Sequence, residues 1–384
     1  MNEENEIFED NIAEWQKEDE FSETILTSDI KEKQLRVIRN NKDYDLEYLV
    51  NSIDKNIFLG PAYQRRSRWT KKQKSLLIES LLLNIPIPPI YLYEREYHIY
   101  EVVDGRQRLE AIKDFFQDKF KLKNLEYINF NGKFFKDFTT DEKRLLQRRS
   151  ISATVLLTES KGFDEVDLRM ILFNRLNTGG VKLNAQELRN AIFSGKFNDL
   201  LIDLSQNSIF RQLWNIPNPI KGQTDYNKLI KMLPNNPLFK TMSDCELVLR
   251  VFGINEVFEN GLTGSMKNIL DSTMKMYQNI DESLLEKFKF KFEKAMEFIV
   301  SIFEGQGIKN PTLSPPKRAR NLYDSFVVAY WNSNEDNLNS KEVIIEKLQV
   351  LLADNENYDK IITKGNSIEN IKFRVTSMIK IFSN

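Results

Sequence analysis

The chain has 384 residues, of which 41% are hydrophobic, and its formal net charge at pH 7 is −1. This length and composition fit one large folded domain or two ordinary ones, and they exclude a fibrous or wholly disordered protein. A single histidine, His98, and a single cysteine, Cys245, exclude an intramolecular disulfide, a thiolate metal cluster and a zinc hydrolase with several histidine ligands. Any metal would therefore be held by oxygen ligands, which favours magnesium or calcium.

The N-terminal end is strongly acidic: residues 1–24 hold ten acidic side chains and one lysine, and the remainder carries a net charge of +8. We interpret residues 1–30 as an acidic, flexible tail, and the alternative is that it screens a basic surface. The acidic start does not fit a signal peptide, and no apolar run approaches the roughly 20 residues of a spanning helix. The sequence therefore predicts a cytoplasmic protein without a membrane segment.

The first structural elements are expected between residues 45 and 104. A short helix followed by a strand is expected over 45–60. Thr70 and Gln73 have the spacing of a capping box at the start of the next helix. Two strands follow, at 90–93 and 98–103, and the second of them runs directly into Asp104-Gly105.

The middle of the chain continues this mixture of helices and strands. A helix with apolar side chains at helical spacing is expected after Gly105. Asn131-Gly132 lies between two apolar stretches, 127–130 and 134–138, and predicts a β-hairpin. A further strand is expected at 151–157.

Two more helices complete this region. Asp164 is expected to open the first, which ends at Gly179-Gly180. Asn184 and Glu187 are expected to cap the second, which stops at Gly195. Beyond about residue 196 the pattern is helical, with breaks at prolines. The sequence thus predicts an α+β protein, with a mixed domain at 31–195 and a mainly helical domain at 196–384.

The segment Asp104-Gly105-Arg106-Gln107-Arg108 is the strongest candidate for a functional site. It lies where a strand ends and a helix begins, and the first turn of a helix has free N–H groups and partial positive charge. Two arginines in that turn are unfavourable for an isolated helix, and they make sense when an anion lies among them. Backbone N–H groups and guanidinium groups together suit phosphate. The alternative is a glycine turn with solvated arginines.

Two further segments carry candidate ligand groups. Residues 61–75 contain six Lys or Arg and no acidic residue, and Tyr63 and Trp69 flank the arginines. Aromatic rings beside arginine suit stacking on bases, although core packing also explains Trp69. The stretch 173–180 combines amides and an arginine with a double glycine, a pattern that helix capping also explains.

Taken in order, these segments resemble one family, the N-terminal domain of GmrSD-type modification-dependent restriction enzymes, which also occurs in phosphorothioate-sensing phage-defence proteins. The resemblance covers roughly residues 45–195 and extends to Asp244-x-Glu246-Leu247-x-Leu249-Arg250. It rests on Pro61-x-Tyr63-Gln64-Arg65, Trp69, Pro86-x-Pro88-Pro89, Asp104-Gly105-Arg106-Gln107-Arg108-Leu109, Asn174-Arg175-Leu176-Asn177, Gly179-Gly180 and Glu187-Leu188-Arg189.

This resemblance implies a fold similar to ParB and sulfiredoxin, and a nucleoside triphosphate bound with Mg²⁺. The implied catalytic residues are Asp104, Gln107 and Arg108, and the implied metal ligands are Asp104 and Glu187. Arg106 stands where the family usually has glutamine, which favours binding over hydrolysis. The implied nucleotide-binding residues are Gln64, Arg65, Trp69, Gly105, Arg106, Asn174, Arg175, Asn177, Gly179, Gly180 and Arg189.

Three functions remain open at the level of sequence. The first is a nucleoside triphosphatase in defence against foreign or modified DNA. The second is a nucleotide- or DNA-binding module without turnover. The third is an interaction protein, oligomeric or monomeric, that acts through a separate nuclease or effector chain. Family members that cut DNA rely on a histidine-dependent nuclease domain, and with His98 as the single histidine we expect no such domain here.

Overall fold

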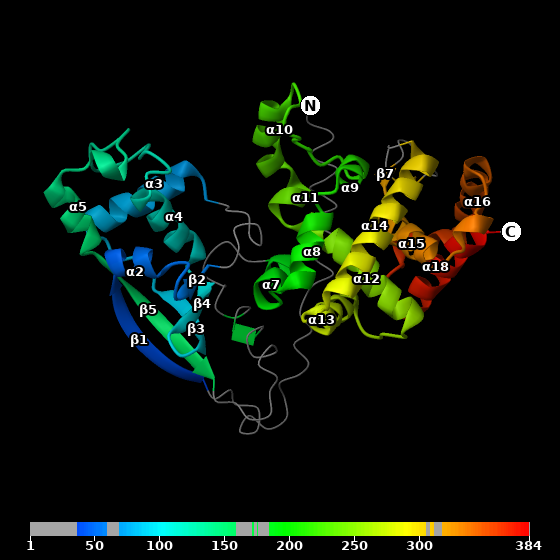
Figure 1. The fold of residues 1–384 in the computed structure, drawn as a ribbon, viewed down its shortest axis with the longest axis horizontal. Helices are drawn as coiled ribbons and strands as arrows, with labels where there is room; N and C mark the ends of the chain where they lie inside the picture. The colour runs from blue at the N-terminus through cyan, green and yellow to red at the C-terminus, as the bar shows by residue number, and fades with distance from the viewer. Residues whose placement is uncertain are drawn as a thin grey trace. The chain divides into compact units, whose positions relative to one another are not determined.

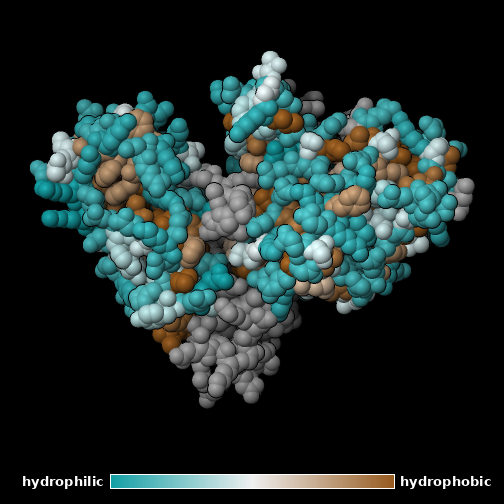
Figure 2. Space-filling model, viewed as in Figure 1, coloured by the Kyte–Doolittle hydropathy of each residue, from teal (hydrophilic) through white to brown (hydrophobic). Residues whose placement is uncertain are grey.

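The computed structural model describes residues 37–59, 69–158, 171–172, 175, 184–304, 308–310 and 317–383. The described residues form two compact units, and the boundary between them in the sequence lies between Leu183 and Asn184. We call them the N-terminal unit and the helical unit. Figure 1 shows the ribbon of both units. Figure 2 shows that hydrophilic side chains cover most of the visible face of each unit.

The N-terminal unit is built on a five-stranded mixed sheet with the order β1-β5-β3-β4-β2. The edge strand β1 (Val37–Asp45) runs antiparallel to β5 (Ser150–Thr158). The hairpin of β3 (Ile90–Glu96) and β4 (Ile99–Asp104) follows, with β3 parallel to β5. The short strand β2 (Ile57–Phe58) pairs in parallel with β4. Together with the helical unit, this sheet confirms the predicted α+β class.

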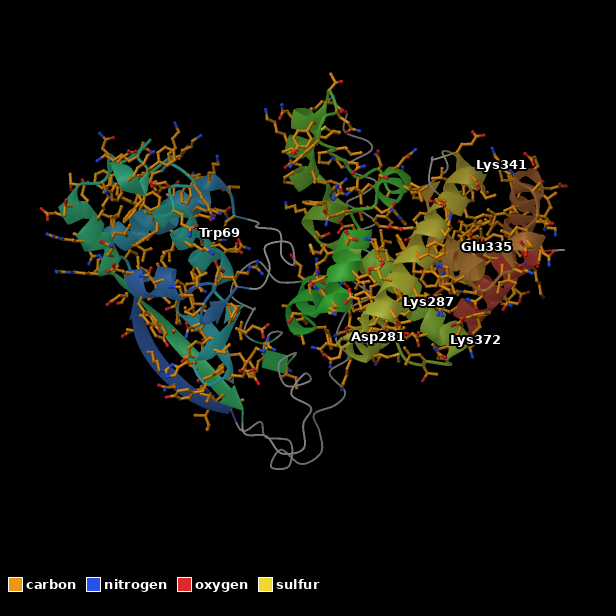
Figure 3. The ribbon with its side chains drawn as sticks, viewed as in Figure 1. Trp69, Asp281, Lys287, Glu335, Lys341 and Lys372 are labelled. Atoms are coloured by element: carbon orange, nitrogen blue, oxygen red, sulfur yellow. The ribbon has the colours of Figure 1, made fainter. Side chains whose placement is uncertain are left out.

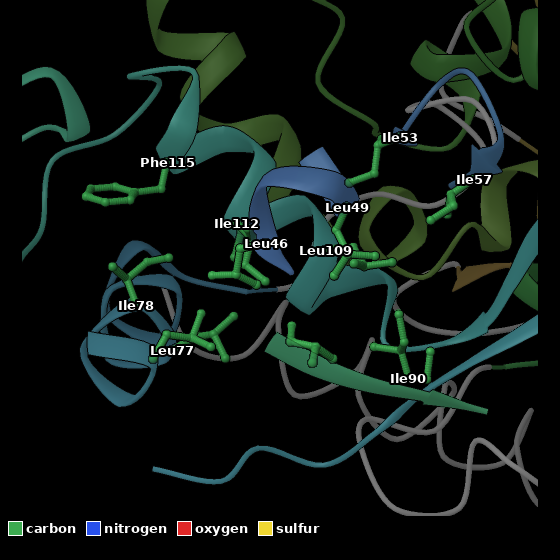
Figure 4. Close-up of a cluster of buried hydrophobic side chains, with 14 of the residues drawn as sticks. Leu46, Leu49, Ile53, Ile57, Leu77, Ile78, Ile90, Leu109, Ile112 and Phe115 are labelled. Atoms are coloured by element: carbon green, nitrogen blue, oxygen red, sulfur yellow. The ribbon is translucent and has the colours of Figure 1, made fainter. Parts of the chain in front are cut away.

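Helices lie on one side of this sheet (Figure 1). On α4 (Arg106–Phe116), Leu109, Ile112 and Phe115 follow one another at helical spacing, and all three are fully buried. Figure 4 shows these side chains packed with leucines and isoleucines from α2, α3 and β3. The core thus fixes the position of α4, whose first turn carries the candidate site. The helices are α2 (Leu46–Ser52), α3 (Lys71–Leu82), α4 (Arg106–Phe116), η1 (Phe135–Asp137) and α5 (Thr140–Gln147).

The predicted capping boxes are confirmed. Thr70 accepts a hydrogen bond from the Gln73 amide at 3.3 Å, and the Gln73 side chain accepts one from the Thr70 amide at 2.9 Å. Asn184 and Glu187 exchange the same pair of hydrogen bonds at the start of α7 (Ala185–Ile192). Each box satisfies two N–H groups that the helix itself leaves without an acceptor.

The predicted hairpin around Asn131-Gly132 is wrong. The turn itself forms, with Gly132 at a φ of 87°, but neither flank is a strand. The amides of Glu126, Tyr127 and Ile128 donate to the carboxylate of Glu79 on α3, at distances of 2.8 to 3.1 Å. Because these N–H groups already have an acceptor, this stretch cannot pair as a strand.

Glu79 is 3% exposed, and its carboxylate is therefore a buried anchor for the loop over residues 126–128. Desolvation by burial raises the pKa of Glu79, but the hydrogen bonds from Tyr127, Glu126 and Ile128 outweigh it and hold the pKa below its ordinary value.

We expect Glu79→Gln to lower the free energy of unfolding of the N-terminal unit by about 2 to 3 kcal/mol at pH 7, because three backbone N–H groups lose a charged acceptor. Since the folded pKa lies below the unfolded one, this contribution is present above the unfolded pKa and is lost as pH falls through the folded pKa. Urea unfolding should therefore show a difference in free energy of unfolding between the wild type and Glu79→Gln that is smaller in acid than at pH 7. Glu96→Gln, at an exposed position, should not differ from the wild type at either pH. A difference for Glu79→Gln that does not change with pH would contradict the electrostatic cause.

The helical unit contains helices and one two-stranded ribbon in its described part. Cys245 is fully buried on α12 (Ser243–Glu259), where it packs as a small core residue. Within the described ranges, no helix has the length and apolarity needed to cross a membrane. After α7 the elements are α8 (Lys196–Leu204), α9 (Ser208–Leu213), α10 (Tyr226–Met232), η3 (Leu233–Asn235), α11 (Pro237–Lys240), α12 (Ser243–Glu259), α13 (Met266–Tyr277), α14 (Glu282–Phe303), β6 (Lys309–Asn310), β7 (Lys317–Arg318), α15 (Arg320–Trp331), η4 (Glu335–Asn337), α16 (Lys341–Ala353), α17 (Asn355–Tyr358), the π-helical η5 (Asp359–Thr363) and α18 (Ile368–Phe382).

Candidate functional site

The candidate site is a tight turn between β4 and α4, as the sequence predicts. β4 ends at Asp104 and α4 begins at Arg106, with Gly105 between them in the left-handed conformation, at φ 95° and ψ 5°. A Cβ atom on Gly105 would lie 2.4 Å from Cγ2 of Ile90 on the neighbouring strand β3. The backbone therefore turns here at a point where both its conformation and its packing require glycine.

Arg108 ties the two sides of this turn together. Its Nη2 donates to Oδ2 of Asp104 at 2.7 Å, which joins the end of the strand to the first turn of the helix. Its Nη1 donates to the carbonyl of Pro88 and, at 3.1 Å, to that of Pro89, in the connector that precedes β3. Arg108 thus positions the turn as well as supplying positive charge to it.

Burial decides which charges of the turn face solvent. The side chain of Arg108 is 12% exposed and that of Asp104 is 32% exposed. Desolvation lowers the pKa of Arg108, while the charge of Asp104 and its hydrogen bond act in the opposite direction. Because an arginine stays protonated at neutral pH even so, the guanidinium remains a cation beside a partly solvated carboxylate.

Arg106 is the second arginine of the turn and is 7% exposed. Its Nε donates to Oε1 of Glu110 at 2.6 Å, one helical turn further along α4. Glu110 is therefore part of the site although the sequence analysis did not single it out; its spacing of four residues was the available signal. The pair keeps a buried cation at the start of α4 without leaving its charge unmatched.

Gln107 differs from its two arginine neighbours. Its Oε1 is buried, and no atom in the described part of the chain donates a hydrogen bond to it. A buried acceptor without a donor costs about 1 to 3 kcal/mol, so such an atom points to a ligand or an ordered water. Gln107 is also in the first turn of α4, where backbone N–H groups lack acceptors within the helix.

Other sequence-predicted residues of the N-terminal half are placed only in part. Trp69 lies just before α3 (Figure 3) and packs, partly buried, against the apolar core of the unit. Arg175 is exposed. His98, expected at the start of the strand 98–103, lies instead in the exposed turn between β3 and β4, at a φ of 61°, and its Nδ1 is 3.3 Å from the hydroxyl of Tyr100. The remaining predicted residues lie outside the described residues, as do the acidic tail and the helix expected from Asp164: Gln64, Arg65, Asn174, Asn177, Gly179 and Gly180.

Glu187 and Arg189 belong to the helical unit, and both are buried there. Oε2 of Glu187 accepts the capping hydrogen bond of α7 at 3.0 Å. Arg189 is 2% exposed, and it pairs with Asp271 on α13 at 2.7 Å and with Glu246 on α12 at 3.1 Å. Glu187 thus caps its own helix, and Arg189 joins α7 to α12 and α13. The predicted ligand roles of both residues stay predictions.

A metal site needs several convergent oxygen ligands. Among the residues that the structure describes, no group of three or more His, Cys, Asp or Glu side chains is placed to hold an ion. Mg²⁺ bound with a nucleotide commonly uses one or two carboxylates together with the phosphates. Asp104 fits that role, since its ion pair uses Oδ2 and a third of its side chain is exposed.

The family model described as "GmrSD restriction endonuclease, N-terminal domain" matches residues 45–194. No curated protein and no solved structure matches the chain. The matched range contains the whole turn at Asp104–Arg108 and ends just after α7, and it confirms the resemblance inferred from the ordered segments. Residues 45–194 therefore belong to the GmrSD restriction endonuclease N-terminal domain family, a restriction-type family of phage-defence proteins.

Proposed function

We propose that the turn at Asp104–Arg108 binds the phosphates of a nucleoside triphosphate in a defence protein of restriction type. The observation that carries this proposal is the buried Oε1 of Gln107 on the first turn of α4, to which no atom of the described residues donates a hydrogen bond. Backbone N–H groups and two nearby guanidinium groups suit a phosphate, which accepts hydrogen bonds. The Gln107 oxygen instead needs a donor, which a bare phosphate dianion lacks and which a nucleotide hydroxyl, a base amine or a bound water provides.

The residues of the turn have different roles in the proposed binding. Arg108 and Gly105 fix the conformation of the backbone, the N-terminus of α4 supplies positive potential, and Gln107 orients the ligand. Asp104 would hold Mg²⁺ together with the phosphates. When bound, the ion would neutralise phosphate charge.

Hydrolysis of the nucleotide is the second candidate function, and the same atom favours it. A glutamine oxygen beside a bound phosphate can orient a water molecule for attack. Binding requires only that Gln107 finds a donor, whereas hydrolysis requires that this donor is the attacking water. DNA and a separate nuclease chain stay predictions, as partners that the resemblance to the family implies.

We expect Gln107→Glu to weaken nucleotide binding by at least about tenfold, because the added carboxylate has nearly the same shape but repels phosphate. Because Oε1 of Gln107 is buried, the new carboxylate should cost some stability, and urea unfolding of the variant shows whether it is folded under the binding conditions. Equilibrium binding of fluorescent ATP, GTP, CTP and UTP to the full chain, with Mg²⁺ and with phosphate release measured in parallel, tests both points.

The matched control is Arg144→Glu on α5, an exposed arginine of the same unit whose replacement also adds negative charge. It should leave nucleotide affinity within about twofold. Unchanged affinity in Gln107→Glu, or an equal loss in both variants, would count against a phosphate site at this turn. If the wild type binds a nucleotide but releases no phosphate, hydrolysis is excluded and the binding function remains.

A further inference from the structure

A second site lies in the helical unit, where three buried charged side chains meet. Arg250 on α12, Asp324 on α15 and Arg374 on α18 are each at most 1% exposed. Arg250 donates to Oδ2 of Asp324 through Nη2 at 2.7 Å and through Nε at 3.0 Å. Arg374 donates to the other oxygen, Oδ1, through Nη1. One carboxylate is therefore shared by two guanidinium groups.

This cluster is unbalanced by one positive charge. The charged groups that act on Arg374 are Asp324, which raises its pKa, and Arg250, which lowers it, and desolvation lowers the pKa most. Arginine does not lose its proton under ordinary conditions, so the excess charge is not removed by titration. Burial of an uncompensated charge costs several kcal/mol, which makes a compensating group inside the unit favourable.

The unmet hydrogen-bonding capacity lies on one edge of Arg374. Its Nη1 is fully used, by Asp324, by the carbonyl of Asn321 and, at 2.8 Å, by the hydroxyl of Ser325. Its Nε and Nη2 are buried and have no acceptor in the part of the chain that the structure describes. The N–H groups of these two atoms point to the same side of the planar guanidinium group, an arrangement that holds an anion by two bonds.

The other arginine of the cluster, Arg250, has no buried nitrogen without a hydrogen-bond partner among the described residues. Besides Asp324, Nη2 of Arg250 reaches Oδ1 of Asn321 at 3.1 Å and Oδ1 of Asn366 at 3.2 Å. A Cβ atom on Gly365 would lie 2.6 Å from Nδ2 of Asn321, so the chain is closely packed on this side. The excess charge and the missing acceptors therefore coincide at Arg374.

We propose that the Nε and Nη2 edge of Arg374 binds a small monovalent anion of halide size, which neutralises the excess charge of the cluster. The ligand has to be small because Asp324, Ser325 and Arg374 are 0% exposed. A water molecule would satisfy the two N–H groups but would leave the charge unbalanced. This site is independent of the nucleotide turn and gives the helical unit a stability that depends on the kind of anion in solution.

Thermal unfolding of the full chain in sodium chloride or bromide, compared with sodium gluconate at equal ionic strength, tests the proposal. The halides should raise the Tm of the helical unit, with saturation, by roughly 2 to 4 °C, as expected for a ligand present above its dissociation constant. Arg374→Met leaves Arg250 and Asp324 as a neutral pair, and its Tm should no longer distinguish halide from gluconate.

The control is Lys287→Met, an exposed cation on α14 of the same unit (Figure 3), which should keep the full halide effect. Crystals grown in bromide provide a second measurement that does not depend on whether the Arg374 variant folds. An anomalous peak within hydrogen-bonding distance of Nε and Nη2 supports the site. Equal Tm values in halide and gluconate, or bromide bound only elsewhere, would overturn it.

Discussion

Asp324→Asn is expected to lower the free energy of unfolding of the helical unit by about 3 to 5 kcal/mol, the usual cost of breaking a buried ion pair from one side. The substitution keeps the shape of the side chain but leaves Arg250 and Arg374 facing one another at 0 to 1% exposure without a carboxylate. Most single substitutions cost far less, and the size of this effect follows from the sharing of one anion by two cations.

Urea unfolding followed by hydrogen exchange locates the change. Peptides from α12, α15 and α18 should lose protection, because these helices meet at the cluster, while peptides from the N-terminal sheet keep it. Glu346→Gln on α16 removes an exposed carboxylate from the same unit and should shift stability by less than about 0.5 kcal/mol. A comparable small shift in Asp324→Asn would show that the cluster contributes little.

Gly105→Ala is expected to destabilise the N-terminal unit by about 2 to 5 kcal/mol. About 1 to 2 kcal/mol of this comes from an L-residue at φ 95°, and about 1 to 3 kcal/mol from forcing a methyl group to within 2.4 Å of Ile90. Because relief of this clash has to move the turn, nucleotide affinity should fall as well.

Gly132→Ala separates the two contributions. Gly132 has a similar φ, 87°, but a Cβ atom there would meet nothing within 4 Å, so its cost is the backbone strain alone. In the background of Ile90→Ala, Gly105→Ala should lose the part of its cost that comes from Cγ2 of Ile90, while the contact with Cβ of residue 90, at 2.9 Å, remains. Equal costs for the two glycine substitutions would mean that the contact with Ile90 is not tight. All four variants can be compared by urea unfolding.

The parts of the fold that the sequence predicted well are those with local signals. The capping boxes at Thr70 and Asn184 involve residues three positions apart. The turn at Gly105 lies where the spacing of apolar residues changes from that of a strand to that of a helix. These features depend on neighbours along the chain, and their physical causes can be recognised without knowing the tertiary structure.

The features that the sequence did not reveal depend on distant partners. β1 has a polar sequence, VIRNNKDYD, because it is an edge strand with most of its side chains exposed, and this hides it from a search for apolar alternation. The loop at 126–128 takes its shape from Glu79, 47 to 49 residues away. Aromatic side chains around Gly132 pack as a cluster that includes Phe115, Phe130 and Phe138, and not as cross-strand pairs.

The same limit applies to the candidate site. The position of the Asp104–Arg108 turn followed from the sequence, but the partners of Arg108 at Pro88 and Pro89 lie 19 and 20 residues away and carry no side-chain signal. Arg189 pairs with residues 57 and 82 positions further along the chain. A charged residue in the range that matches the family can thus form ion pairs in the protein interior. Only the tertiary structure shows which residues are its partners.

Helix α7 lies inside the range that matches the family, residues 45–194, yet it belongs to the compact unit that begins at Asn184. The family domain therefore ends on a helix whose buried arginine is neutralised by Asp271 and Glu246, beyond the match. During evolution, an exchange of the C-terminal region would have to preserve a pair of carboxylates for Arg189.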